Sequence, residues 1–321
     1  MNYGEIINQN LQRYPWSKYA YHFTDVTNAV NILAEGKLYS RKLAIDKKLM
    51  MSDNASEKII SYSDDVTKYV RFYFRPMTPT QYYNEGYKHP DFRFENNKNA
   101  NVTVPIFFLF DLESMLNSGR IMFSEKTLAG INPAPPKRGS QNFAALPFDK
   151  IYSTNYYDTD NKAFKHAELV CLNEFALEPY LRKIVCRNSI KVLTLVLLLY
   201  EKNSVLFDKY KSIIFKENAD KLKLFERNGL FVEKIFLDGG NLHINFSKTD
   251  WHYNKRFNRN SSEVEVSVLV GEKNFSTKVN YCSPSDYVVQ VGKISTSTVV
   301  KIFFDDHLAA FDPINVAPNN D

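Results

Sequence analysis

FKHAELVCL, residues 164–172, is the stretch around which we expect the fold of this chain to be built. Its residues alternate as in a half-buried strand, so that Leu169 and Cys171 share one face while His166 and Glu168 share the other. A carboxylate therefore falls in mid-strand, where Glu is uncommon. On a covered face it needs a cation or hydrogen-bond donors to replace its hydration, whereas an edge-strand Glu that faces water is the commoner case.

A second strand is expected at YAYHF, residues 19–23. Thr24 or Asp25 can cap a following helix, whose apolar residues recur at helical spacing until Gly36 ends it. His22 is thus predicted at a strand end, immediately before a helix N-terminus. Strand ends that lead into helices are where α/β folds place ligand-binding groups, although a lone His is more often structural.

A third strand is expected in YVRFYFRP, residues 69–76, because its apolar residues alternate with polar ones. The polar face consists of Tyr69, Arg71, Tyr73 and Arg75. Alternating Tyr and Arg suit stacking on rings and binding of phosphates, but a solvated face with extended arginines has the same pattern. Pro76 and Pro79 end the strand. The turn that follows offers short hydrogen-bonding groups and rings at Thr78, Thr80, Gln81, Tyr82 and Tyr83.

Between these strands and residue 164 the chain is expected to alternate buried elements with loops. Residues 102–110 predict a buried strand that enters a helix capped by Asp111. The proline-rich and glycine-rich segment 130–149 predicts a loop whose Lys137 and Arg138 either meet a phosphate or are solvated charges. A polar loop at 152–160 leads into the Glu168 strand and places Tyr156 and Tyr157 beside that Glu.

The composition changes after Lys202, so we expect two domains, residues 1–203 and 204–321. The second begins with a helical pattern at 207–227 and continues as short alternating strands between Gly, Asn, Asp and Ser turns. This spacing is typical of a small β-sandwich or open barrel. It contains no catalytic signature, only a basic and aromatic cluster of Trp251, His252, Arg256, Phe257 and Arg259 that is also consistent with a hairpin tip.

Composition limits the function classes. With 321 residues and 44% hydrophobic content the chain can build a substantial core. Its 20 Tyr, 24 Phe and net charge of +5 suit a stacking, negatively charged partner such as a nucleotide or single-stranded nucleic acid. The three cysteines lack metal-ligand spacing, so neither a metal site nor a disulfide framework is expected. The amino terminus has no secretory pattern and the apolar run 190–200 is too short to cross a bilayer, so we expect a cytoplasmic protein without a membrane partner.

No phosphate-cradling glycine loop, H-E-x-x-H or G-x-S-x-G motif is present. Instead, five stretches occur in order between residues 19 and about 200: YHFTDVTNAVNILAEGKLYS, YVRFYFRPMTPTQYYNEG, FSEKTLAGI, LPFDKIY and HAELVCLNEF. Together they resemble the DNA-targeting ADP-ribosyltransferase toxins of the DarT family. The remaining 120 or so residues lie outside the core of the resemblance.

The resemblance implies an α/β (α+β) fold with a split mixed sheet and helices, followed here by the β-rich C-terminal domain, and an enzyme that uses NAD+ as co-substrate without a metal. Glu168 then corresponds to the catalytic carboxylate, and either Arg71 or Arg75 to the arginine that contacts NAD+ or substrate. The residues assigned to NAD+ binding are His22, Tyr21, Thr24, Arg41, Tyr73, Thr80 and Tyr83. Those assigned to the nucleic-acid substrate are Gln81, Tyr82, Lys137, Arg138, Tyr156, Tyr157 and His166.

His166 indicates which kind of group accepts the ADP-ribose. Transferases that modify protein arginine carry a second Glu two residues before the catalytic one, whereas this chain carries His166. A nucleobase is therefore the expected acceptor, and single strands are favoured because a duplex base must first be flipped out. DNA is the first choice and messenger RNA the alternative, in a toxin that serves phage defence. A cognate antitoxin, with or without an ADP-ribose-removing macrodomain, is the expected partner. Two other classes remain: a non-catalytic single-strand-binding module and a protein-modifying transferase.

Overall fold

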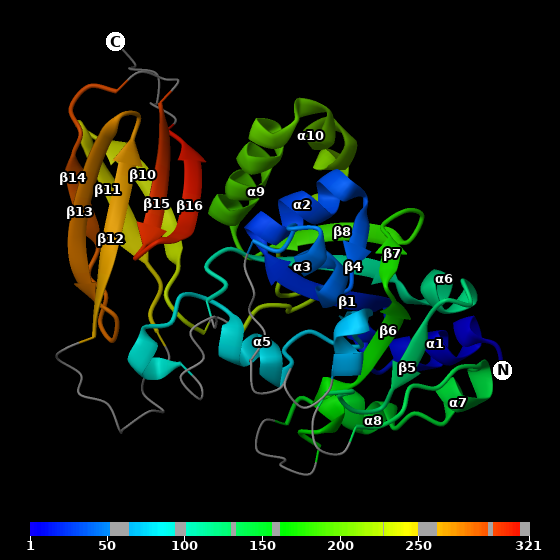
Figure 1. The fold of residues 1–321 in the computed structure, drawn as a ribbon. Coiled ribbons are helices and arrows are strands. Elements are labelled where there is room, and N and C mark those ends of the chain that lie inside the picture. The colour runs from blue at the N-terminus through cyan, green and yellow to red at the C-terminus, as the bar shows by residue number, and fades with distance from the viewer. Residues whose placement is uncertain are drawn as a thin grey trace.

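The computed structural model describes residues 1–51, 64–93, 101–129, 133–155, 161–226, 228–249, 262–294 and 298–314. Tyr156 and Tyr157, and the cluster expected between residues 251 and 259, lie outside this described part. Figure 1 shows a mixed α/β unit beside a β-rich unit. The predicted fold class, a mixed sheet with helices followed by a β-rich C-terminal part, is confirmed.

The mixed unit is organised around a seven-stranded sheet in the order β5-β6-β3-β1-β4-β8-β9. Its strands are β5 (Met122–Ser124), β6 (Glu168–Leu172), β3 (Tyr69–Tyr73), β1 (Tyr19–Asp25), β4 (Pro105–Asp111), β8 (Leu181–Cys186) and β9 (Ile214–Lys216). All neighbours are antiparallel except the parallel pair β8 and β9. A separate pair, β2 (Lys37–Tyr39) and β7 (Glu174–Ala176), lies beside it.

Helices flank this sheet. They are α1 (Tyr3–Leu11), α2 (Val26–Glu35), α3 (Arg41–Asp46), α5 (Pro79–Asn84), α6 (Leu112–Asn117), α7 (Ser140–Ala144), α8 (Phe148–Ile151), α9 (Ser189–Lys202) and α10 (Ser204–Tyr210). The 3₁₀ turns are η1 (Pro15–Lys18), η2 (Asp64–Lys68), η3 (Pro90–Phe92), η5 (Phe164–His166) and η6 (Lys211–Ile213). In the described part of the chain no helix has the length and apolar character needed to cross a bilayer.

The sequence signals around α2 are confirmed. Asp25 accepts a hydrogen bond from the backbone N–H of Thr27, and Gly36 ends the helix in the left-handed conformation at φ 64°. The place of His22 is different from the prediction. Because β1 runs on to Asp25, His22 is an interior strand residue that pairs with Phe108 of β4.

The Glu168 strand also differs in detail. Residues 164–166 form the turn η5, so β6 begins at Glu168 and the carboxylate is at the start of the strand and not in its middle. Since β6 lies between β5 and β3, the edge-strand alternative is wrong, and the side chain of Glu168 is 0% exposed.

The β-rich unit is a sandwich of two antiparallel sheets (Figure 1). One sheet holds β10 (Val232–Asp238), β11 (Asn241–Phe246) and β14 (Tyr287–Gln290). The other holds β13 (Lys273–Asn280), β12 (Glu263–Val270), β15 (Val299–Phe304) and β16 (His307–Pro313). Alternate residues of both sheets face a common valine-rich and isoleucine-rich core, as two facing sheets require.

The division between the two units falls later than expected. The predicted helix at 207–227 is limited to α10 and η6, because β9 then joins the seven-stranded sheet. Tyr210, Leu224 and Phe225 are buried in the same core as that sheet. We therefore propose that the C-terminal part of the β-rich unit begins after Phe225 and not at residue 204, while Tyr87 from the earlier part of the chain also lies in its core.

Helix α9, which the apolar run 190–200 predicted, packs between the two units (Figure 1). Its Lys191 is fully buried and donates a hydrogen bond to the carbonyl of Ala309 in β16. Burial, reinforced by the charge of Arg187 and opposed by Glu233 and Asp25, lowers the pKa of Lys191 to about 7.

This lysine predicts a pH effect on stability. Between pH 7 and its unfolded pKa of about 10.4 the unfolded chain carries a proton that the native state lacks, so stability rises with pH in that window. Relative to Lys191→Met, we expect the free energy of unfolding of the wild type to rise by about 1 kcal/mol per pH unit from pH 7 to 9. Urea unfolding of both proteins at pH 7, 8 and 9 measures this, and parallel curves would show that Lys191 stays protonated.

Candidate active site

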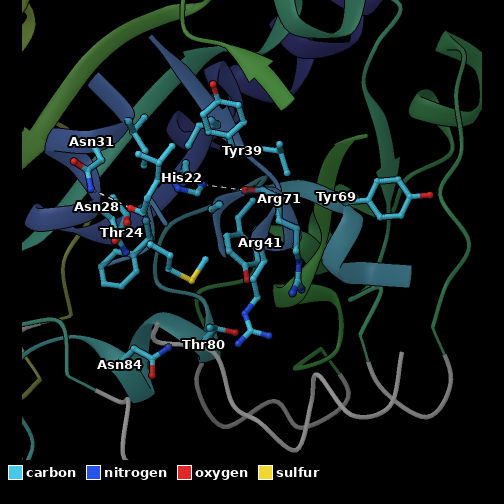
Figure 2. A pocket seen from close by; sticks show the side chains of 18 of the residues that line it. His22, Thr24, Asn28, Asn31, Tyr39, Arg41, Tyr69, Arg71, Thr80 and Asn84 are labelled. Carbon is cyan, nitrogen blue, oxygen red and sulfur yellow. Dashed lines mark hydrogen bonds between the residues drawn. The ribbon is translucent and has the colours of Figure 1, made fainter. Parts of the chain in front are cut away.

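A cavity of about 280 Å³ opens between α2, α3, β3 and α5 in the mixed unit (Figure 2). Its polar lining comes from His22, Thr24, Asn28, Asn31, Glu35, Tyr39, Arg41, Tyr69, Arg71, Tyr73, Thr78, Thr80, Gln81 and Asn84. Its apolar lining comes from Phe23, Ile32, Leu38, Ala44, Leu49, Met50 and Val70. The cavity thus combines hydroxyl, amide and guanidinium groups with apolar side chains, as ligand sites for polar ring compounds do.

His22 is held rigidly in this cavity. Its Nδ1 lies 3.0 Å from the carbonyl oxygen of Arg71, and because a carbonyl only accepts, Nδ1 carries the proton. The ring also stacks on Phe108 with centroids 6.3 Å apart. Burial lowers the pKa of His22 although the Arg71 carbonyl opposes the shift, so the ring is neutral near pH 7 and Nε2 is an acceptor.

Arg71 and Glu168 form the central charged pair. Strands β3 and β6 are antiparallel neighbours that pair Arg71 with Val170 and Tyr73 with Glu168. The Nε of Arg71 donates to Oε2 of Glu168 at 3.0 Å, and its Nη2 forms an ion pair with Oε1. The side chain of Arg71 is 31% exposed, whereas Glu168 is fully covered. Arg71 therefore lies between the cavity and the carboxylate.

The charges of the pair affect their neighbours. Burial acts against ionised Arg71, but Glu168 and Tyr73 outweigh it and raise the pKa of the guanidinium. Tyr73 also lines the cavity and interacts with Thr80. Burial raises the pKa of Tyr73, with Arg71 opposing and Glu168 adding to the shift, so its hydroxyl is protonated at neutral pH.

Arg75 does not share this site. Because β3 ends at Tyr73, Arg75 turns away from the cavity and is only 4% exposed. Its guanidinium donates to the carbonyls of Pro76, Ile151 and Ser153 and stacks on the ring of Trp16 at 4.8 Å. Of Arg71 and Arg75, only Arg71 lines the cavity, so we propose a structural role for Arg75 in place of the expected catalytic one.

Four other residues expected to bind NAD+ or nucleic acid, Tyr21, Tyr82, Tyr83 and Gln81, are placed differently from the prediction or are already bonded within the protein. Tyr21 is fully buried, and its hydroxyl donates to the carbonyl of Trp16, away from the cavity. Tyr82 and Tyr83 pack edge to face against one another and do not line the cavity. Gln81 lines it, but the Gln81 amide is occupied by bonds within the protein.

The basic loop residues Lys137 and Arg138 do not line the cavity either. Lys137 is exposed and its backbone pairs with Phe123, while Arg138 donates to the carbonyl of Gly119 at 2.9 Å. His166 precedes β6 in η5. Burial, with Arg71 and Lys162 next in effect, lowers the pKa of His166 to about 4, so this ring is neutral beside the Arg71 charge.

The structure places four of the residues expected to contact NAD+, besides His22, in the cavity: Thr24, Arg41, Tyr73 and Thr80. Figure 2 shows Arg41 extending toward Thr80, which lies near Asn84. Sequence reasoning missed Asn28, Asn31 and Glu35, which line the cavity from one face of α2. Their spacing of three and four residues is the helical signal that could have found them.

A model of the family described as ssDNA thymidine ADP-ribosyltransferase, DarT, matches residues 21–206. Among solved structures, Thermus sp. 2.9 DarT in complex with carba-NAD+ shares 16% identity over 64% of this chain and 97% of its own, with a TM-score of 0.48. The same Thermus protein in complex with ADP-ribosylated ssDNA shares 16% identity over 65% and 98%, with a TM-score of 0.48. Thermosipho africanus DarTG in complex with ADP-ribose shares 12% identity over 68% and 53%, with a TM-score of 0.47. None of the curated proteins matches significantly.

Proposed function

The chain belongs to the DarT family of single-stranded-DNA thymidine ADP-ribosyltransferases, and from this premise we propose how its residues perform the reaction. The enzyme transfers ADP-ribose from NAD+ to single-stranded DNA. We assign NAD+ to the cavity between α2, α3, β3 and α5, and catalysis to Glu168. The observation that carries the assignment is the Arg71–Glu168 pair at the wall of that cavity.

The groups in the cavity fit NAD+. Neutral His22 offers Nε2 as an acceptor for a ribose hydroxyl, and Thr24, Thr80 and Asn84 add further donors and acceptors. Arg41 supplies a fixed positive charge suited to the pyrophosphate. Tyr69 and Tyr73 line the same cavity with rings that can stack on nicotinamide.

The chemistry requires a carboxylate at the reacting ribose carbon. As the bond between nicotinamide and C1′ breaks, positive charge develops on the ribose, and a nearby carboxylate stabilises it. Nicotinamide leaves as a neutral ring, and a thymine nitrogen forms the new bond to C1′. The proton lost from that nitrogen passes to Glu168 and then to water.

Arg71 must move for this to occur. It covers both carboxylate oxygens of Glu168, so the carboxylate reaches the ribose only after the guanidinium turns toward the cavity. The NAD+ pyrophosphate or the target base then provides a new partner for Arg71. Substrate binding thereby exposes the catalytic group.

We propose that the DNA strand approaches along η5, immediately before Glu168. The Nζ atoms of Lys126 and Lys150 lie 4.8 and 5.1 Å from the centroid of the Phe164 ring. Lys126 is followed by Thr127, whose hydroxyl is 3.5 Å from Nη2 of Arg71, so this group of cations adjoins the Arg71–Glu168 pair. An aromatic ring flanked by lysines suits bases and phosphates of a single strand.

Charge reversal tests this path. The double variant Lys126→Glu with Lys150→Glu is expected to weaken binding of a thymidine-containing oligonucleotide and to reduce the slope of log K against log salt by about 1.4, as two lost phosphate contacts on a single strand imply. Fluorescence anisotropy across a salt series measures both. Lys211→Glu with Lys278→Glu, two exposed lysines elsewhere, is the matched control. If both double variants lose affinity equally, only net charge matters and the path is wrong.

We further propose a biological setting. The protein acts as a toxin in the cytoplasm, paired with an antitoxin with or without a macrodomain that removes ADP-ribose, and serves phage defence. Radiolabelled NAD+ with matched DNA and RNA oligonucleotides tests the substrate. Label on DNA supports the proposal, label on RNA alone would replace DNA by messenger RNA, and label only on protein would assign a protein-modifying transferase.

A further inference from the structure

Helix α5 forms one wall of the cavity and contributes Thr80, Gln81 and Asn84 to its lining. Figure 2 shows Thr80 and Asn84 together on this wall. The helix has only six residues, capped by the side chain of Thr78. Helices this short are not stable by themselves, so their position is set by tertiary contacts.

Several of the contacts that hold α5 come from the segment that leads into the β-rich unit. The amide of Gln81 accepts from the Met77 N–H at 2.6 Å and donates to the carbonyl of Leu224 at 2.8 Å and to Glu85 at 2.6 Å. The carboxylate of Glu85 is fully buried and accepts the Glu226 N–H at 3.0 and 3.1 Å. Buried hydrogen bonds of this kind fix position, because losing one leaves a desolvated polar group without its partner.

Asn228 and Gly229 continue this segment and pass very close to the chain around Gly86. Asn228 donates from Nδ2 to the carbonyl of Tyr82 at 2.8 Å, which adds a bond to the helix backbone. Gly86, at φ 79°, lies so close that a Cβ there would be 2.5 Å from the carbonyl oxygen of Asn228. A Cβ on Gly229, at φ 101°, would be 2.9 Å from the carbonyl oxygens of Glu85 and Tyr87. Only glycines allow the two backbones to approach so closely.

Beyond this crossing the chain enters the sandwich. Tyr87 and Leu230 exchange backbone hydrogen bonds of 3.1 and 2.8 Å. The Tyr87 ring is fully buried in the sandwich core, 5.7 Å from the ring of Phe304, and its hydroxyl donates to Asp305. The chain that leaves α5 is thus anchored between the strands of the second unit.

We infer that the β-rich unit is a working part of the NAD+ pocket, with Gln81, Glu85 and Asn228 as positioning residues that hold α5 and present Thr80 and Asn84 to the co-substrate. The inference rests on the proposed function in taking the cavity as the NAD+ site. The Arg71–Glu168 pair is carried by β3 and β6, whereas Gln81, Glu85 and Asn228 lie on or beside α5. Loosening α5 therefore weakens binding of NAD+ and leaves the chemical step unchanged.

Asn228→Ala and Glu85→Gln test the inference. Each removes one buried hydrogen bond, so we expect the KM for NAD+ to rise about five- to tenfold with kcat within about twofold. Calorimetric titration with NAD+ should show the same fold loss in affinity without any turnover. Asn274→Ala, an exposed Asn on β13 of the same unit, is the matched control and should behave as the wild type.

The outcomes separate the two proposals. If both variants melt earlier than the wild type but keep its KM and NAD+ affinity, the network is only structural and the inference is overturned. A fall in kcat at unchanged KM would overturn it too. A wild type that neither binds NAD+ nor labels DNA would overturn the proposed function itself, and the inference with it.

Discussion

Glu168→Gln is expected to lower ADP-ribosylation of single-stranded DNA by about a thousandfold, since the variant keeps the shape of the side chain and removes the charge that stabilises the reacting ribose. Binding of NAD+ should persist, because Glu168 is covered by Arg71 and does not line the cavity. Transfer of labelled ADP-ribose to a thymidine-containing oligonucleotide measures the loss. Circular dichroism and calorimetric binding of NAD+ establish that the variant is folded.

Glu174→Gln is the matched control, because it makes the same change in β7, where Glu174 pairs with Lys37 in a partly exposed ion pair. Exposed pairs of this kind contribute little to stability, and this one lies outside the cavity lining. Near wild-type transfer by Glu168→Gln would remove Glu168 from catalysis. If instead neither the wild type nor the variant labelled DNA and the variant kept the biological effect, the chain would be a single-strand-binding module.

Gly86→Ala is expected to produce the largest change in stability, a loss of about 2–4 kcal/mol in the free energy of unfolding, because left-handed backbone strain and crowding act together. The added methyl would meet the Asn228 carbonyl and the Phe231 ring, and neither can withdraw without opening the crossing beside α5. Urea unfolding at fixed pH measures the loss. An increase in the KM for NAD+ should accompany it.

Gly292→Ala separates the two causes. Gly292 has a similar φ of 75°, but an added Cβ there meets nothing within 4 Å. Only backbone strain then acts, so a loss of about 1 kcal/mol is expected. Equal losses at the two positions would show that the crossing has room for a methyl group.

Strand alternation and helix-capping residues predicted the parts of the site that depend only on neighbouring residues in the sequence. The alternation at 69–73 placed Arg71 and Tyr73 on one face of β3, and the cap at Asp25 and the end at Gly36 gave the limits of α2. The same alternation placed Arg75 on that face, which fails because β3 ends first and the chain turns. Strand ends depend on the partner strand, which a single stretch does not specify.

What the sequence could not show depends on pairing between distant residues. Arg71 covers Glu168 because β3 lies beside β6, although the two residues are almost a hundred positions apart. Strand β9 likewise joins the first sheet from beyond α10, so the change of composition after Lys202 did not indicate the division of the chain. The sequence shows that Asn28, Asn31 and Glu35 share one face of α2, but it does not show that this face lines a cavity.

The chain passes between the two units more than once, and this limits how the protein can be truncated. Tyr87 enters the sandwich core, Thr103 still donates to the carbonyl of Leu308, and Pro105 is already back in the first sheet. After Phe225 the chain crosses again. A truncation at Phe225 would therefore leave Tyr87 and Thr103 without the sandwich residues that they contact, so a single cut releases neither unit whole.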